Sequence, residues 1–144
     1  MTFKWLDRGR QLLQISDGSV TQLSDVGLPW SLSGVWLNSF NAIAVGDGIF
    51  SKTIPEIIRA TPWQAHHQGL TPFYSHAVRG NAVNNIFIAG AYGEILHYNG
   101  LRWKSLRSET IWTGGSYLRV DVKNNVGCAV GFKSGNGLIL LGRQ

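Results

Sequence analysis

The sequence predicts an all-β fold, namely a β-propeller of four-stranded antiparallel blades with about three and a half blades in the chain. Three observations lead to this prediction. Similar segments recur at intervals near 42 residues, the chain holds 18 glycines and 6 tryptophans among 144 residues, and short apolar runs alternate with hairpin-turn dipeptides. With 44% hydrophobic and 15% charged residues, the composition is that of a folded domain, not of a disordered chain.

The repeat is visible in three segments that share the order strand, asparagine-containing turn, apolar strand, glycine and further strand. They are GVWLNSFNAIAVGDGIFSKT from Gly34, AVRGNAVNNIFIAGAYGEILHYN from Ala77 and RVDVKNNVGCAVGFKSGNGLILLG from Arg119. The matched valines are 43 and 42 residues apart, at Val35, Val78 and Val120. The matched glycines are 44 and 41 residues apart, at Gly46, Gly90 and Gly131. A unit of this length is the size of a propeller blade.

The local chemistry of each unit favours strands. Asp17-Gly18 and Asn99-Gly100 are dipeptides that tight hairpin turns prefer, because glycine accepts a positive φ and Asp or Asn tolerates one. The runs AIAV, NIFIAG and GCAVG, the last of which holds Cys128 and Val130, are typical of strands covered on both faces. A proline opens the only helical signal, a single turn expected over Pro55 to Ala60.

The units form one array. It has a partial blade over 1–30, full blades over 31–70 and 71–110, and a partial blade over 111–144. Because complete propellers use about four to eight blades, the arc would leave strand edges and apolar faces uncovered. We expect a homo-oligomer, a dimer in which the N-terminal strands of one copy complete the last blade of the other. A small imperfect ring and a fragment of a longer propeller are the alternatives.

Two runs resemble a known family. VWLNSFNAIAVGDG from Val35 and VRGNAVNNIFIAGAYGEILHYNGLRW from Val78 are similar to propellers of the BNR or Asp-box type, which include photosystem II assembly-factor-like proteins and bacterial surface propellers. The resemblance spans nearly the whole chain and is strong from Gly34 to Leu106. It implies the fold and leaves the function open. The Asp-box itself is reduced to Ser16-Asp17-Gly18 without a following tryptophan, and to the Asn99–Trp103 segment.

Charge and cysteine content exclude several classes. The net charge is +5, but the 13 basic residues are spread along the chain, so a solvated surface is favoured over an anion-binding face and no nucleic acid is expected. Cys128 is the only cysteine, which rules out an intrachain disulfide. The four histidines lack the spacing of a metal set, and no phosphate loop or catalytic triad stands out, so neither metal nor cofactor is predicted.

Candidate binding residues follow from the repeat. Trp36, Arg79 and Asp121 each follow a matched valine, so they should share an orientation, at the central channel or its mouth. There they either read a polar ligand or, for the two charged ones, pair with each other. Connections between the second and third strands of each unit should gather on one face as a recognition surface, with Asp47, Tyr92, Phe132 and Lys133.

The predicted function is a non-catalytic scaffold that binds a protein, or assembles a larger complex, through this loop face. A carbohydrate-binding propeller with stacking Trp and Tyr side chains is the alternative. A glycoside hydrolase ranks third, because the arginine cluster, tyrosine nucleophile and carboxylates of a sialidase are missing. No apolar stretch reaches the roughly 20 residues of a membrane span, and Met1 to Arg10 lacks a signal peptide's apolar segment. We expect a cytoplasmic protein if the chain is complete, and a periplasmic or extracellular one if it is a processed fragment.

Overall fold

A computed structural model describes residues 2–4, 12–66, 70–110 and 114–143. Within these ranges the chain forms strands and two short 3-10 turns, and no α-helix. The all-β prediction is therefore confirmed. The strands make four antiparallel sheets of three or four strands, each of them open at both edges.

Within each sheet, consecutive strands along the chain pair with one another, so each sheet is a meander. The first sheet contains β1 (Thr2–Lys4), β2 (Leu12–Ser16) and β3 (Ser19–Leu23). The second contains β4 (Leu32–Leu37), β5 (Asn41–Gly46), β6 (Gly48–Thr53) and β7 (Gln64–Ala65). The third contains β8 (Ser75–Ala82), β9 (Asn85–Gly90), β10 (Ile95–Tyr98) and β11 (Trp103–Ser105). The fourth contains β12 (Ser116–Lys123), β13 (Val126–Lys133) and β14 (Asn136–Arg143).

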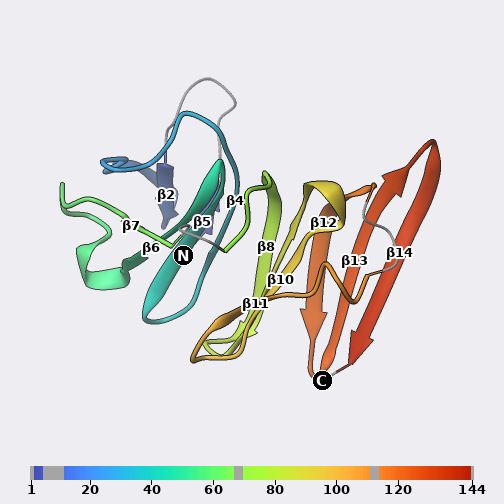
Figure 1. Cartoon of the computed structure of the whole chain (residues 1–144). Coiled ribbons are helices and arrows are strands. Elements are labelled where there is room, and N and C mark those ends of the chain that lie inside the picture. Colours follow the sequence, from blue (N-terminus) through green and yellow to red (C-terminus); the bar gives the residue numbers. More distant parts are fainter. Residues whose placement is uncertain (1, 5–11, 67–69, 111–113, 144) are drawn as a thin grey trace.

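The sheets follow one another in chain order and pack face to face (Figure 1). Strands β4 and β5 pack against β8, and β12 packs against β8 and β9. One cluster of buried apolar side chains fills each of the three spaces between consecutive sheets. The series is open at its two ends, so the first and last sheets each have one face without a neighbouring sheet of the described chain.

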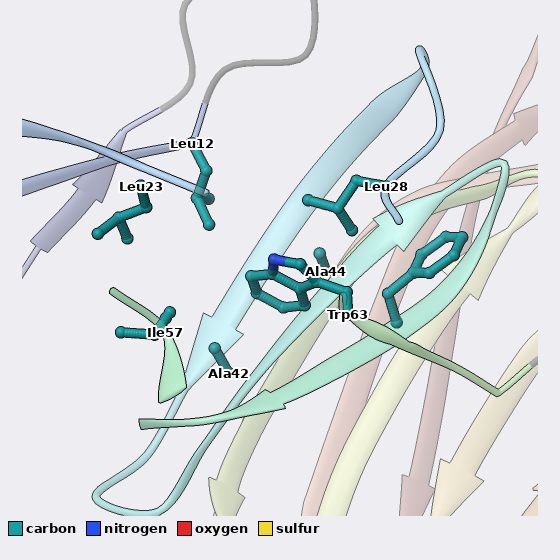
Figure 2. Close-up of a cluster of buried hydrophobic side chains, with 8 residues drawn as sticks. Leu12, Leu23, Leu28, Ala42, Ala44, Ile57 and Trp63 are labelled. Atoms are coloured by element: carbon teal, nitrogen blue, oxygen red, sulfur yellow. The ribbon is translucent and has the colours of Figure 1, made fainter. Parts of the chain in front are cut away.

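The first cluster joins the first and second sheets around Trp63 (Figure 2). Leu12 and Leu23 reach it from β2 and β3, and small alanines of β5 make room for the indole ring. The indole N–H of Trp63 donates a hydrogen bond to the carbonyl oxygen of Ser24, 3.1 Å away. A buried Trp N–H needs such a partner. This hydrogen bond connects Trp63, just before β7 of the second sheet, to Ser24, just after β3 of the first sheet.

Side chains of the two middle sheets alternate between two clusters. In β5, Ala42 and Ala44 belong to the first cluster, while Ile43 and Val45 belong to the second. The third cluster takes Ala89 from the third sheet, with Tyr117, Val120 and other side chains from the fourth. Successive strand residues point to opposite faces, which is why AIAV and NIFIAG are apolar without interruption.

The fourth sheet departs from this pattern, because only one of its faces is covered. Ala129 is buried against the third sheet, whereas its neighbours Cys128 and Val130 lie on the outward face, half-buried and exposed respectively. The prediction that GCAVG is covered on both faces is wrong. Strands β5 and β9 have a neighbouring sheet on each face, whereas β13 has one only on the face that packs against the third sheet.

The matched glycines occupy equivalent places. A Cβ atom at Gly90 would lie 2.8 Å from the carbonyl oxygen of Tyr74, the residue before β8. At Gly46 and Gly131 it would come still closer, to the carbonyl oxygens of Ser31 and Ser116. Each glycine therefore lies at or near the end of the second strand of its sheet, where the backbone at the start of the first strand approaches too closely for a side chain.

The turns at Asp17-Gly18 and at Asn99-Gly100 differ in length and in hydrogen bonding. Asp17 and Gly18 join β2 to β3 with φ of 49° and 78°, as a primed hairpin turn requires. Between β10 and β11, the connection is longer, and Oδ1 of Asn99 accepts hydrogen bonds from the backbone N–H groups of Leu101 and Arg102. Asn99 thus stabilises this turn through its side-chain oxygen.

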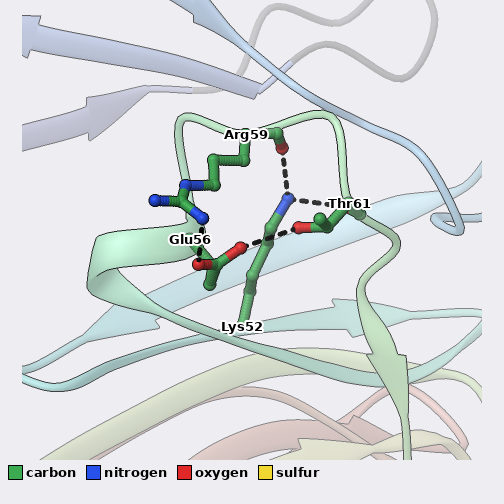
Figure 3. A network of polar contacts seen from close by, with 4 residues as sticks. All are labelled: Lys52, Glu56, Arg59 and Thr61. Atoms are coloured by element: carbon green, nitrogen blue, oxygen red, sulfur yellow. Dashed lines mark hydrogen bonds and ion pairs between the residues drawn. The ribbon is translucent and has the colours of Figure 1, made fainter.

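A buried lysine holds the excursion that follows β6, where a 3-10 turn, η1 (Ile54–Glu56), replaces the predicted helical turn. Lys52 is 6% exposed, and its ammonium donates hydrogen bonds to the carbonyl oxygens of Arg59 and Thr61, both 2.7 Å away (Figure 3). Burial lowers the pKa of Lys52, and the nearby Glu56 carboxylate partly offsets this. These bonds fold the loop back toward Trp63, whose ring centroid is 6.0 Å from the ammonium.

Candidate binding cleft

A cleft of about 360 Å³ lies between the second and third sheets. It opens at the end where three connections meet, those between β4 and β5, β8 and β9, and β10 and β11. The lining residues are Asn38, Asn41, Ile43, Ile49, Ser51, His66, Val83, Ile86, Tyr98, Leu101, Arg102 and Trp103. This volume falls at the lower end of small-molecule sites, which span about 300 to 1,000 Å³.

One wall of the cleft is aromatic. Tyr98 and Trp103 face each other across the β10–β11 pair, with ring centroids 5.1 Å apart and ring planes 37° apart. The Tyr98 hydroxyl donates a hydrogen bond to the carbonyl oxygen of Gly100, 2.9 Å away, which fixes this ring. Beneath the rings lie the buried side chains of the second cluster, so the wall has a rigid apolar base.

The rim of the cleft is polar and built by two similar turns. Oδ1 of Asn38 accepts hydrogen bonds from the backbone N–H groups of Phe40 and Asn41, at 2.7 and 2.9 Å. Asn99 does the same in the β10–β11 connection. Because each turn is closed by a side-chain oxygen, the amide of Asn41 and the guanidinium of Arg102 project from ordered backbone.

Opposite the aromatic wall, a serine and a histidine are in contact. Oγ of Ser51 lies 2.5 Å from Nε2 of His66, and the backbone N–H of His66 donates to the carbonyl oxygen of Ile49, 2.7 Å away. A serine activated for attack needs, besides a histidine, an orienting group and donors for an oxyanion. No Asp or Glu is among the cleft-lining residues in the described part of the chain. The lining offers hydrogen bonds and apolar contact.

The three predicted strand residues share an orientation but do not meet. Trp36 points toward the third sheet, where its indole N–H donates to the carbonyl oxygen of Gly80, 2.9 Å away. Arg79 lies on the side of the third sheet that faces the fourth, and its Nη1 donates to the carbonyl oxygen of Val78. Asp121 lies on the outward face of the fourth sheet. In the described ranges no ion pair joins Arg79 to Asp121.

The predicted loop residues lie at the end of the sheets away from the cleft. Asp47 lies between β5 and β6, Tyr92 lies between β9 and β10, and Phe132 and Lys133 end β13 just before its turn into β14. These three connections lie at one end of the sheets and are spread along the array (Figure 1). Two residues that the sequence did not single out, Phe73 and Arg107, extend this surface at its centre. The Phe73 ring centroid lies 5.1 Å from that of Tyr92 and 4.8 Å from Cζ of Arg107, and Arg107 Nε donates to the Tyr92 carbonyl oxygen.

The cleft was missed as a site by sequence reasoning. In the sequence, Trp103 stood out only as the end of the reduced Asp-box segment, and His66 only as one of four histidines without metal-site spacing. The signal that was available is the pair of similar turns, Asn38 followed by Asn41 and Asn99 followed by Arg102, but nothing local indicates that the two face one space. Among the described residues no three His, Cys, Asp or Glu side chains gather as a metal site. No helix there has the length and apolar character to span a bilayer.

Comparison with known proteins does not assign the chain to a family, since no family model, curated protein or solved structure matches it.

Proposed function

We propose that this chain is a non-catalytic interaction module whose four sheets serve as blades of a β-propeller, and that a second copy completes the ring. The observation that supports the proposal is the outward face of the fourth sheet. An exposed apolar sheet face of this kind marks an interaction site in soluble proteins.

The side chains of this face are large and lie next to one another. Val130 pairs with Ile139 across β13 and β14, and Cys128 pairs with Leu141. The exposed fractions are 40% for Val130, 50% for Phe132, 75% for Ile139 and 69% for Leu141. In the second and third sheets, the equivalent faces are covered by the next sheet along the chain. The same kind of cover is missing here from the described chain.

The occupant that fits is the first sheet of a second copy. Leu12 and Leu23 face the second sheet, so the alternating positions Leu13, Ile15 and Val20 lie on the opposite face. These would pack on β13 and β14 of the partner copy, just as successive sheets of one chain pack on each other. The sequence favoured N-terminal strands that complete the last blade of the partner copy. We propose face-to-face cover instead, which is supported by the pairing of β1, β2 and β3 as a sheet of their own.

Two copies joined by this contact form a closed assembly. Each copy has one open face at each end of its series, so two copies make two identical contacts. Together they supply about eight sheets, which lies within the range of about four to eight blades in known rings.

A partner protein would bind at the end of the sheets that carries the β9–β10 connection. Tyr92 is 58% exposed and rests on Phe73, which also carries the guanidinium of Arg107. Tyrosine and arginine are enriched among the residues that dominate binding energy at protein interfaces. Asp47, Phe132 and Lys133 lie at the same end, so the loop face remains the proposed recognition surface.

Solution mass tests the proposal. Light scattering of the full chain should give about twice the monomer mass of 15.8 kDa. Replacing Ile139 with lysine should give a folded monomer, because it places a charge in the middle of the contact. The matched control is Ile58→Lys, an equally exposed isoleucine (70%) in the loop after η1, which should leave the mass unchanged. A monomeric, well-folded wild-type chain would overturn the two-copy ring.

A further inference from the structure

We propose that the cleft between the second and third sheets binds one sugar unit of a glycan. The Tyr98–Trp103 wall would cover the apolar face of the sugar ring, and Asn38, Asn41 and Arg102 would bond its hydroxyls. This site is separate from the loop face and from the outward sheet face, and it does not depend on the assembly of two copies.

The chemistry of the lining matches that of a pyranose. Such a ring has a face of C–H groups and an edge of hydroxyls that both donate and accept hydrogen bonds. An aromatic ring covers apolar area at a low cost in conformational entropy, and tryptophan adds an N–H donor at its edge. Trp103 is half-buried, and within the described ranges its indole N–H donates no hydrogen bond, so that donor is available at the cleft.

The polar groups of the rim are held in place and still have bonding capacity. The Asn38 oxygen is used by two backbone N–H groups, which orients the amide and leaves its NH₂ group as a donor. Asn41 offers an amide that both donates and accepts. Arg102 is exposed, forms no ion pair within the described ranges, and presents a fork of donors that suits two adjacent hydroxyls.

The charges around the cleft favour a neutral sugar over an anion. Among the described residues that line the cleft, Arg102 is the one arginine or lysine, whereas phosphate and nucleic-acid sites combine several cations. The size agrees as well, because a cleft of about 360 Å³ accommodates a small polar ligand and not an extended chain.

The same lining favours binding over hydrolysis. Glycosidases place two carboxylates across the bond that they cleave, and the described lining of the cleft contains none. The Ser51 hydroxyl is bonded to His66 and lies opposite the aromatic wall, where it is positioned to meet a sugar hydroxyl.

Binding to an array of neutral and acidic oligosaccharides, with the labelled full chain, tests the site. We expect a small set of neutral glycans to bind. Titration with the best-bound oligosaccharide, followed by tryptophan fluorescence, should show that Trp103→Ala weakens binding by on the order of tenfold. The control is Trp30→Ala, which removes a highly exposed tryptophan outside the cleft and should leave the affinity unchanged.

Because Trp103 also packs on the second cluster, a second variant keeps the test decisive. Arg102→Ala changes only an exposed side chain and should reduce affinity several-fold with no change in the circular dichroism spectrum. Binding should survive Ile139→Lys, since that residue lies on the outward face of the fourth sheet. The proposal is overturned if no oligosaccharide binds above background, if neither Trp103→Ala nor Arg102→Ala weakens binding, or if the bound glycan is released as hydrolysis products.

Discussion

The indole N–H of Trp36 donates a hydrogen bond to the carbonyl oxygen of Gly80 across 2.9 Å, and this bond joins the second sheet to the third. The ring lies directly over the glycine. A Cβ atom at position 80 would be 2.7 Å from Cζ2 of Trp36 and 3.0 Å from Cγ1 of Ile86. The contact between the two sheets therefore requires the absence of a side chain at position 80.

Gly80→Ala should destabilise the protein, because the added methyl group forces the rigid indole away from its acceptor and from the second cluster. We expect a loss of about 1–3 kcal/mol in the free energy of unfolding, measured by urea denaturation. Gly137→Ala in β14 is the matched control, since a Cβ there meets nothing within 4 Å. Equal effects of the two substitutions would contradict the account of the Trp36–Gly80 contact.

The stability lost when a matched glycine is replaced with alanine should be larger where the neighbouring backbone lies closer to the added methyl group. Gly131→Ala should be the more damaging, with a loss above about 3 kcal/mol, because the methyl group would overlap the Ser116 carbonyl. Gly90→Ala should cost less, since the Tyr74 carbonyl oxygen is 2.8 Å from the Cβ position. Gly142→Ala, which meets nothing within 4 Å, should be near neutral. Thermal denaturation of the three variants would give this order, and a reversed order would disprove it.

Stability should fall as the pH falls below about 6.5, partly because of His97. Burial lowers the pKa of His97, and the positive charge of Lys104 lowers it further. Its ring stacks on Phe87 at 4.4 Å, and its Nε2 is 3.2 Å from Oδ1 of Asn85. Between the lowered pKa and about 6.5, the unfolded chain binds more protons than the folded one, so lowering the pH favours unfolding.

The His97→Gln variant isolates this contribution, because glutamine keeps an amide donor and does not titrate. Urea denaturation at pH 7.5 and pH 5 should show a larger loss of stability for the wild type than for the variant. His76, whose pKa is also lowered by burial, is present in both proteins and cancels in the comparison. Equal losses would show that His97 does not contribute to the pH dependence.

Much of the strand pattern could be predicted because it depends on residues that are close together in the sequence. AIAVG and NIFIAG became β5 and β9, and Asp17-Gly18 became a primed hairpin turn, since φ preferences and side-chain alternation act over a few residues. The outer strands were less visible. β7 covers Gln64–Ala65 and pairs only with β6, and an outer strand that pairs on one side has less need for apolar alternation.

Equivalent positions in sequence did not guarantee equivalent roles. Trp63 and Trp103 lie 40 residues apart, close to the repeat interval, yet Trp63 is buried in the first cluster and Trp103 lines the cleft. The difference arises from Leu28 and Ile57, which cover the first ring from segments outside the matched strands. Likewise, Trp36, Arg79 and Asp121 share an orientation but do not share an environment. Trp36 faces the third sheet, Arg79 faces the fourth, and Asp121 lies on the uncovered outward face, so the repeat alone does not assemble them into one site.

The sequence by itself determined the all-β class, the apolar strands and the glycines that permit close backbone approach, because each of these depends on residue type and short-range spacing. Only the tertiary structure decided which sheet faces are covered and which turns meet across a cleft. Asn38 and Trp103 are 65 residues apart and line one space because two sheets stack, and stacking is set by the summed burial of many side chains, which no local pattern contains.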